Sequence, residues 1–226
     1  MTESIGARIR EARMARGMSL RSVAQSVGVS ASLISQVETG KTQPSVSTLY
    51  AIVNHLGISI DQLLDVVAPA EPTHLSLAAD ASMPTVQRGD ENAVLEMENG
   101  VRWERLSAGA GGPADALLVT YDPGAASSVE GKLMRHAGVE YAYLLEGELV
   151  LQLEFDEHVI RAGDSLHFDS VRPHQYVNRG SVPARGVWFV VGRRQHNSSM
   201  PSAPGAAHPD GSLSSAVDVL RALDTL

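Results

Sequence analysis

Apolar side chains recur every three or four positions along the first 66 residues, and serine, glycine and other polar residues separate the runs. This spacing predicts short helices that each turn one apolar face toward a common core. Serines ahead of the runs and glycines behind them are typical helix boundaries. We therefore expect five helices, over residues 4–16, 20–26, 31–39, 45–56 and 60–66. Their predicted core is Ile5, Ile9, Leu20, Val23, Ala24, Val27, Val29, Ile34, Val37, Leu49, Ile52, Val53, Leu56, Ile58, Leu63 and Leu64.

After residue 91 the pattern changes to short alternating runs divided by proline, glycine, aspartate and asparagine. Runs of this kind predict strands, and many short strands at close intervals indicate a closed or double-sheet β architecture. The expected strands are residues 101–106, 116–121, 141–145, 148–155, 165–168 and 186–191.

The two patterns together predict an α+β protein of two domains. The helical domain covers residues 1–66 and the β domain covers residues 92–195. Residues 67–91 are rich in alanine, proline, serine and aspartate and are interpreted as a linker. Residues 196–226 form a predicted flexible tail that ends in a short amphipathic helix.

Composition narrows the compartment and the chemistry. The chain has no cysteine, which excludes disulfides, a cysteine nucleophile and a cysteine-ligated metal site. No apolar run approaches the roughly 20 residues that span a bilayer, and the N-terminus lacks the apolar stretch of a secretion signal. We expect a cytoplasmic protein.

Charge is divided unevenly between the two domains. Residues 1–66 hold six basic and five acidic side chains, a net charge of +1. The whole chain has a net charge of −8, so the residues after 66 have a net charge of −9. A near-neutral domain with clustered arginines can engage phosphates, whereas an acidic domain is repelled by them. The charge pattern favours a DNA-binding role for the helical domain alone.

Residues 18–45 predict a helix, a tight turn at Gly28 and a second helix with a polar face. Two helices that cross in this way leave the second free to enter the major groove of DNA. Glutamine can pair with adenine and serine can bond several base edges, while side chains at helix starts and loops contact phosphates. The candidate DNA-binding residues are Ser19, Arg21, Ser30, Ser32, Ser35, Gln36, Lys41, Thr42 and Ser45.

These residues resemble the XRE-type (lambda-repressor-like) helix-turn-helix family over about residues 5–66, most closely from Ser35 to Lys41 and at Pro44-Ser45. The resemblance implies that Ser30, Ser32 and Gln36 read bases and that Glu38 is an internal structural acid. The alternative is a helical bundle of this family that binds protein rather than DNA.

The β domain contains His136 and Glu140, and His174 lies farther along the chain. Over about residues 100–192 the sequence looks like the cupin superfamily, whose barrel is a double-stranded β-helix. The first cupin motif matches at His136, Glu140 and Gly147, and the second at Gly163, His174 and Asn178. Three positions depart from the family: Met134 stands where the first motif has a histidine, and Asp169 and Val171 replace a proline and a glycine.

The matched positions imply a metal site of His136, Glu140 and His174. Two imidazoles and one carboxylate suit non-haem Fe(II) with open positions, and also Zn, Ni or Mn. The alternative is an organic-ligand pocket without metal. Met134, Tyr176 and Trp188 are the candidate effector-pocket residues, although aromatic side chains in a barrel are usually core. We interpret His158 and His167 as ordinary residues on the surface of strands.

Two functions follow. The first is a transcriptional regulator, not an enzyme, that binds an operator as a homodimer and a small-molecule effector in its barrel. The second is a mononuclear iron oxygenase, because the segment His136–Glu140 and Pro173-His174 resemble hydroxypropylphosphonate epoxidase. That enzyme uses a lysine near the start of its second helix, whereas this chain has none between Gly17 and Leu20. The sequence favours the regulator.

Overall fold

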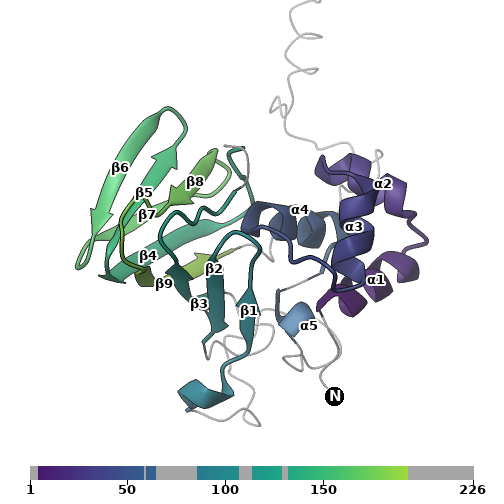
Figure 1. Ribbon diagram of the computed structural model, residues 1–226, viewed down its shortest axis with the longest axis horizontal. Helices are drawn as coiled ribbons and strands as arrows, with labels where there is room; N and C mark the ends of the chain where they lie inside the picture. The colour runs from purple at the N-terminus through teal and green to yellow at the C-terminus, as the bar shows by residue number, and fades with distance from the viewer. Residues whose placement is uncertain (1–4, 59, 65–85, 107–113, 129–131, 193–226) are drawn as a thin grey trace, which may run out of the picture.

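A computed structural model describes residues 5–58, 60–64, 86–106, 114–128 and 132–192. It consists of a helical domain followed by two antiparallel sheets that face each other (Figure 1). The helices are α1 (Ile5–Ala15), α2 (Leu20–Val27), α3 (Ala31–Glu38), α4 (Val46–Leu56) and the single-turn α5 (Ile60–Leu64).

The predicted helix starts are confirmed because each serine caps its helix. The hydroxyl oxygens of Ser19, Ser30 and Ser45 accept hydrogen bonds from the backbone N–H groups three residues later. Such bonds satisfy donors that the first helical turn leaves unpaired. Helices α2 and α4 end at Gly28 and Gly57, whose positive φ angles of 73° and 60° favour glycine.

The core of the helical domain follows the predicted apolar faces. Most of the predicted residues are buried, and the others that the structure describes, such as Leu20 and Val29, are half-buried against that core. Val46, Tyr50 and Ile60 are buried as well, although the helical pattern does not predict them. Val46 and Tyr50 lie on α4, on the side that faces the barrel.

Nine strands form the described part of the β domain. They are β1 (Val94–Glu96), β2 (Val101–Arg105), β3 (Ala114–Tyr121), β4 (Val139–Glu146), β5 (Glu148–Leu153), β6 (Asp156–Arg161), β7 (Ser165–Asp169), β8 (His174–Val177) and β9 (Ala184–Val191). One sheet has the order β1-β2-β3-β9-β4-β7 and the other β6-β5-β8, with antiparallel neighbours throughout.

The six predicted strands are confirmed, and β1, β6 and β8 are additional. Strand β8 was not predicted because it is only four residues long and shows no alternation. Its first three residues, starting at His174, are all buried. Strand β6 was not predicted because only Ile160 of its six residues is buried, so it shows no alternation either. Two aromatic residues of β4, Tyr141 and Tyr143, are 48% exposed and so lie outside the core.

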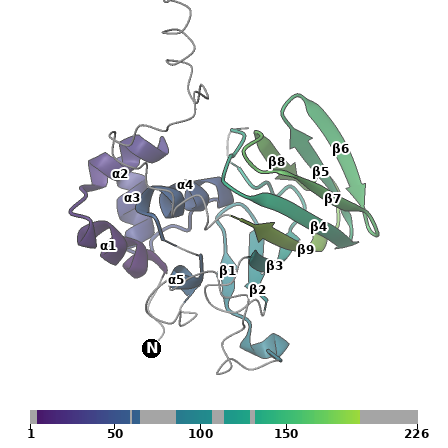
Figure 2. The same cartoon turned by 180° about the vertical axis from the view of Figure 1, so that it is seen from behind.

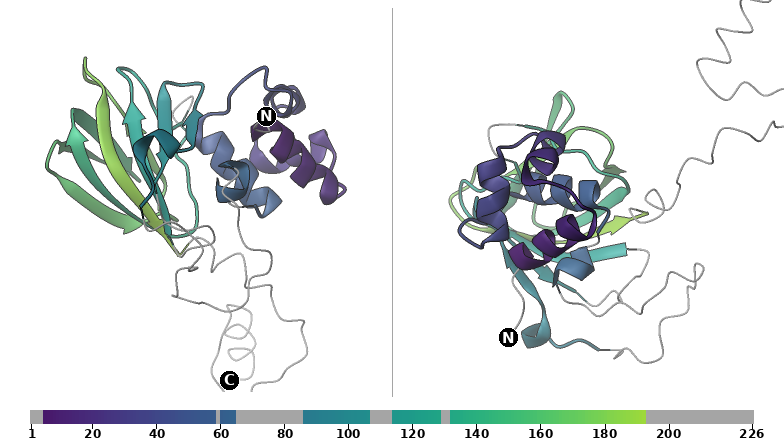
Figure 3. Two further views of the ribbon diagram at one scale, coloured as in Figure 1. Left: turned by 90° about the horizontal axis from the view of Figure 1, so that it is seen from below. Right: turned by 90° about the vertical axis from the view of Figure 1, so that its right-hand side faces the viewer.

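The helical domain packs against one end of the barrel, and α4 lies between α1–α3 and the strands (Figures 2 and 3). Two backbone hydrogen bonds join the parts: Ser47 N–H donates to Ser127 O at 3.0 Å, and Glu98 N–H donates to Pro44 O at 3.4 Å. No helix among the described residues is long and apolar enough to cross a membrane. The predicted C-terminal helix and most of the predicted linker lie outside the described residues, so the domain boundaries remain a prediction.

Candidate DNA-binding surface and metal centre

The exposed face of α3 and its flanks carries most of the predicted DNA-binding residues. Ser32 and Gln36 point out of α3 into solvent, and Ser30 is exposed at its start. Ser19, Arg21 and Lys41 are also exposed, while Ser35 and Thr42 are half-buried. These residues lie on α3, at the start of α2 and in the flanking loops, and Figure 1 shows α2 and α3 on the side of the helical domain that is away from the strands.

The three capping serines differ in what their hydroxyl groups can still bind. The Ser19 and Ser30 hydroxyls accept a backbone hydrogen bond, so each still has its own proton to donate to a phosphate oxygen or a base. Ser45 is 2% exposed and its hydroxyl bonds Ser47 and Thr48. A side chain this deeply buried cannot reach a phosphate, so Ser45 is not part of the DNA-binding surface.

Glu38 has the structural role that the resemblance implies. Its two carboxylate oxygens accept from Arg13 Nε at 2.6 Å and from another Arg13 guanidinium nitrogen at 2.8 Å. A third nitrogen of Arg13 donates to Met18 O, at the loop before α2. Such a two-pronged pair is geometrically specific, and here it ties the end of α3 to α1. The Glu38 carboxylate raises the pKa of Arg13.

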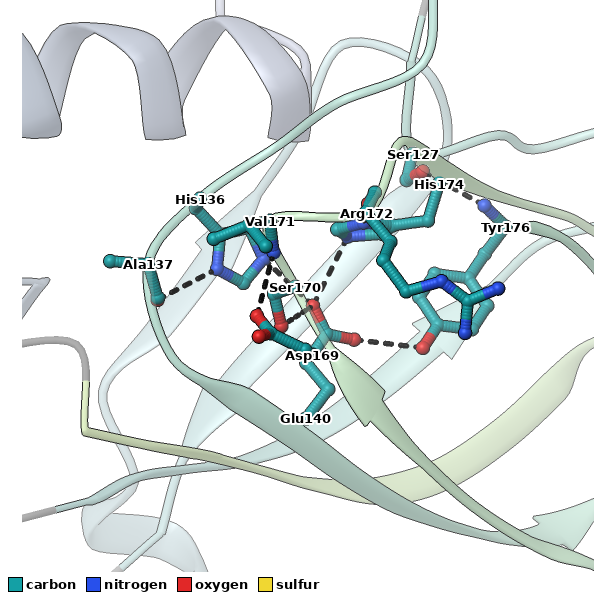
Figure 4. Close-up of polar contacts among 10 residues, drawn as sticks. All are labelled: Ser127, His136, Ala137, Glu140, Asp169, Ser170, Val171, Arg172, His174 and Tyr176. Atoms are coloured by element: carbon teal, nitrogen blue, oxygen red, sulfur yellow. Dashed lines mark hydrogen bonds and ion pairs between the residues drawn. The ribbon is translucent and has the colours of Figure 1, made fainter. Parts of the chain in front are cut away.

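The centre of the barrel holds His136, Glu140 and His174, and all three are buried (Figure 4). His136 precedes β4, Glu140 lies on β4 of the larger sheet, and His174 begins β8 of the smaller sheet. Residues 38 positions apart along the chain meet because the two sheets face each other. One ligand atom from each residue lies within 4.8 Å of the others.

These distances fit a bound metal ion. Glu140 Oε1 is 2.7 Å from His136 Nε2 and 3.2 Å from His174 Nε2. Two ligands at right angles, each about 2.1 Å from an ion, would be roughly 3.0 Å apart. The carboxylate oxygen is thus spaced from each imidazole nitrogen as neighbouring ligands of one ion are, and three protein ligands would leave further positions open.

The hydrogen-bonding partners of the two rings support the same conclusion. The Nδ1 atoms face carbonyl oxygens of Ala137 and Arg172, at 3.2 and 2.8 Å. A carbonyl only accepts, so Nδ1 must donate and a neutral ring carries its lone pair on Nε2. Both Nε2 atoms are buried without a hydrogen-bond partner, although each lies at contact distance from a carboxylate oxygen. A lone pair on Nε2 and a negatively charged carboxylate oxygen repel each other at this distance. A cation between the three atoms, or protonation of the rings, would make the contact attractive.

Glu140 is held as a carboxylate by its neighbours. Burial by itself raises the pKa of Glu140, but the rings of His136 and His174, when protonated, outweigh it through hydrogen bonds and charge and lower that pKa well below 4.5. Tyr176 donates its hydroxyl proton to Glu140 Oε2 at 2.8 Å, and the Ser170 hydroxyl lies 3.5 Å from Oε1. Burial, and then the charge of Glu140, raises the pKa of Tyr176 well above 10, so this tyrosine remains a donor.

A cavity of about 20 Å³ adjoins Glu140, which is room for about one water molecule. The predicted pocket residues Met134, Tyr176 and Trp188 all line it. Most of the other lining residues were not predicted to line a pocket, among them Val46 and Tyr50 of α4. These two are the lining residues that come from the helical domain. Val46 and Tyr50 are four positions apart and so share one face of the helix. That face is buried because the barrel packs against it. His158 and His167 are exposed on strands, as predicted.

Comparison with known proteins agrees with this arrangement. A helix-turn-helix family model matches residues 9–63 and a cupin domain model matches residues 117–190. The HTH-type transcriptional regulator PuuR of Escherichia coli is 28% identical over 182 residues, which cover 76% of this chain and 86% of PuuR.

One solved regulator shares the fold. The crystal structure of an HTH_3 family transcriptional regulator from Vibrio cholerae matches with a TM-score of 0.58 and 19% identity, over 83% of this chain and 94% of that one. The hydroxypropylphosphonic acid epoxidase from S. wedmorenis matches with a TM-score of 0.43 and 19% identity, over 82% of this chain and 96% of the enzyme, a likeness too low to support a conclusion. The chain thus contains a helix-turn-helix domain of the XRE type followed by a cupin domain.

Proposed function

We propose that this protein is a sequence-specific DNA-binding transcriptional regulator whose barrel binds a divalent transition metal and responds to a small-molecule effector. The observation that carries the proposal is the solvent-facing polar surface of α3, backed by an intact helix-turn-helix core. The name of PuuR, an HTH-type transcriptional regulator that aligns over both domains, supports it. A regulator of this kind acts where the DNA is, in the cytoplasm.

On DNA, α3 enters the major groove. Gln36 pairs with a base, adenine being the one that a glutamine reads with two hydrogen bonds, and Ser30 and Ser32 bond neighbouring base edges. Arg21 and Lys41 contact the phosphates that flank the groove, together with Ser19, Ser35 and Thr42. The barrel stays off the DNA, since the chain beyond residue 66 carries a net charge of −9.

In the barrel, His136, Glu140 and His174 hold one ion per chain, with Fe(II), Zn, Ni and Mn as the candidates. The bound ion supplies a positive charge that a buried carboxylate and two unpartnered imidazole nitrogens lack. Elemental analysis of the purified protein is expected to give one transition metal per chain, and the double variant His136→Ala/His174→Ala is expected to give none. A metal-free wild-type protein would instead indicate an organic-ligand pocket.

Dimerisation uses the outward face of β4 and β9. This outer apolar face consists of Tyr141, Tyr143, Leu145, Phe189 and Val191, which are 37–48% exposed. The residues are contiguous, because Tyr141 is paired with Phe189 across the two strands. Exposed apolar patches of this kind mark protein interfaces, and a two-fold dimer matches the two half-sites that one recognition helix per chain requires.

A second candidate function, an Fe(II)-dependent oxidase or epoxidase, is favoured by the ligand set alone. A substrate would have to enter the cavity beside Glu140, which with α4 in place holds about one water molecule. For this reason the regulator is the preferred function. Oxygen consumption by the Fe(II)-loaded protein, tested on small hydroxylated organic acids, would favour the enzyme.

Footprinting on the DNA upstream of the protein's own gene tests the main proposal. At fixed, near-physiological salt the protein is expected to protect two half-sites whose centres lie about one helical turn, roughly 34–36 Å, apart. The absence of protection at every concentration that leaves random DNA unbound would contradict a regulator.

A further inference from the structure

Helix α4 belongs to two cores at once. Its residues Leu49, Ile52 and Leu56 are fully buried among the helices of the DNA-binding domain. Its residues Val46 and Tyr50 point the other way and line the cavity beside Glu140. One rigid helix therefore touches both the DNA-binding domain and the interior of the barrel.

The start of α4 is fixed to the rim of the barrel by its backbone. Ser47 N–H, one of the donors that the first turn of a helix leaves unpaired, donates to Ser127 O at 3.0 Å. Just before the helix, Pro44 O accepts from Glu98 N–H at 3.4 Å. We call this arrangement, with both bonds formed, the docked position of α4.

Tyr50 connects the docked helix to the candidate metal ligands. Its ring lies parallel to the His136 imidazole, with centroids 4.4 Å apart and 9° between the planes. On another side it meets the edge of Trp103 at 5.5 Å and 63°. Tyr50 and His136 are both 4% exposed, so the stack is almost completely removed from water.

We propose that Tyr50 couples occupation of the His136–Glu140–His174 site to the docked position of α4, and thereby to the DNA-binding domain. The coupling rests on the proposed function, which it deepens. An ion held by His136 would give its imidazole positive charge, and the negatively polarised face of an aromatic ring attracts a cation. The bound ion therefore strengthens the stack with Tyr50 and holds α4 against the barrel.

The signal has a direct route to the recognition helix. Helix α4 packs against α2, and α2 packs against α3, which bears Gln36. Docking of α4 thus sets how the whole helix-turn-helix is held relative to the barrel, and in a dimer the spacing of the two recognition helices. Coupling of this kind is reciprocal, so docking of α4 must strengthen ion binding by the same factor.

Hydrogen exchange of the full chain, with Zn²⁺ as the probe ion, measures the docking without DNA. In the wild type, Zn²⁺ is expected to slow amide exchange in residues 46–50 by about 3- to 30-fold, the range of a cation–π contact that is partly to fully desolvated. Tyr50→Leu keeps an apolar side chain but removes the aromatic face, and is expected to abolish this slowing. Tyr50→Phe keeps the face and is expected to retain it.

Zn²⁺ affinity gives the reciprocal measurement. By calorimetry, Tyr50→Leu is expected to bind Zn²⁺ more weakly by the factor that the exchange experiment gives, and Tyr50→Phe to bind as the wild type does. Unchanged exchange on Zn²⁺ binding to the wild type would overturn the coupling, as would equal slowing in Tyr50→Leu.

Failure of the coupling and failure of the proposed function have different signatures. If Zn²⁺ slows exchange in α4 through Tyr50 but no operator is protected in footprinting, the coupling holds and the regulator does not. If the wild type binds no Zn²⁺, Fe²⁺, Ni²⁺ or Mn²⁺, the metal part of the function is wrong and the coupling is overturned with it.

Discussion

At the scale of single residues, the two functional regions depend on side chains that differ in how they are held. Gln36 is exposed on α3 and is free to meet a base, whereas Tyr176 is 1% exposed and fixed by its bond to Glu140. Substitutions at these positions therefore test different properties, specificity for Gln36 and metal affinity for Tyr176.

Gln36→Ala is expected to weaken binding to the operator by about 1–3 kcal/mol, because one pair of hydrogen bonds to a base is lost. Affinity for random DNA is expected to stay the same, since the charged phosphate contacts are untouched. Titrations of both DNAs by fluorescence anisotropy at one salt concentration give the comparison. An equal loss on the two DNAs would make Gln36 a positioning residue.

Tyr176→Phe is expected to lower affinity for a divalent ion by about 10- to 100-fold, the usual effect of losing a group that orients a metal ligand. The Tyr176 hydroxyl holds Glu140 Oε2, so the carboxylate is freer to turn without it. Isothermal titration with Zn²⁺ measures the change. Tyr121→Phe is the matched control, because Tyr121 lines the same cavity and its pKa is likewise raised, first by burial and then by the charge of Glu140. Equal losses in both variants would exclude a specific role for Tyr176.

At the scale of elements, the turn between β4 and β5 fixes the geometry of the barrel. Gly147 has a φ of 76°, and a Cβ atom there would lie 2.5 Å from Pro183 O and 2.8 Å from Ala184 Cα. The matched cupin position thus needs glycine for two reasons, a left-handed backbone and the close approach of the segment that enters β9.

Gly147→Ala is expected to destabilise the protein by more than Gly163→Ala. Gly163 also has a positive φ, of 96°, but a Cβ there would meet nothing within 4 Å. The control should therefore cost only the backbone strain, about 1–3 kcal/mol, and the difference between the two variants reports the clash. Urea unfolding followed by tryptophan fluorescence gives both free energies of unfolding, and equal values would contradict the close approach.

The elements also show where local pattern is sufficient. Ser19, Ser30 and Ser45 cap the helices that they were expected to cap, because capping depends on residues only three positions apart. Strands β6 and β8 were not predicted, because the burial of a strand depends on which strands and loops cover it. These come from distant parts of the chain.

At the scale of the whole molecule, the outer apolar face and the docked α4 place two interfaces on one chain. The first joins two copies in the proposed dimer, and the second joins the two domains of one copy. If the dimer supplies both recognition helices, its loss must affect DNA binding more than metal binding.

Phe189→Glu is expected to give a monomer in sedimentation velocity, because a charge would be buried at the centre of the outer apolar face. Operator affinity should fall, while one metal ion per chain is retained, since Phe189 points away from the barrel interior. Val182→Glu is the control, because Val182 is 57% exposed on a loop outside that face. A dimeric Phe189→Glu variant would exclude this interface.

By itself, the sequence determined the helices and their caps, six of the strands, the two kinds of domain and the three candidate metal ligands. These depend on short-range periodicity and on motifs whose spacing is read directly from the chain. Only the tertiary structure decided that Ser45 is buried, that Tyr141 faces outward, and that Val46 and Tyr50 close the barrel. Periodicity tells which face of an element is apolar, but what covers that face is decided by packing between segments far apart in the sequence.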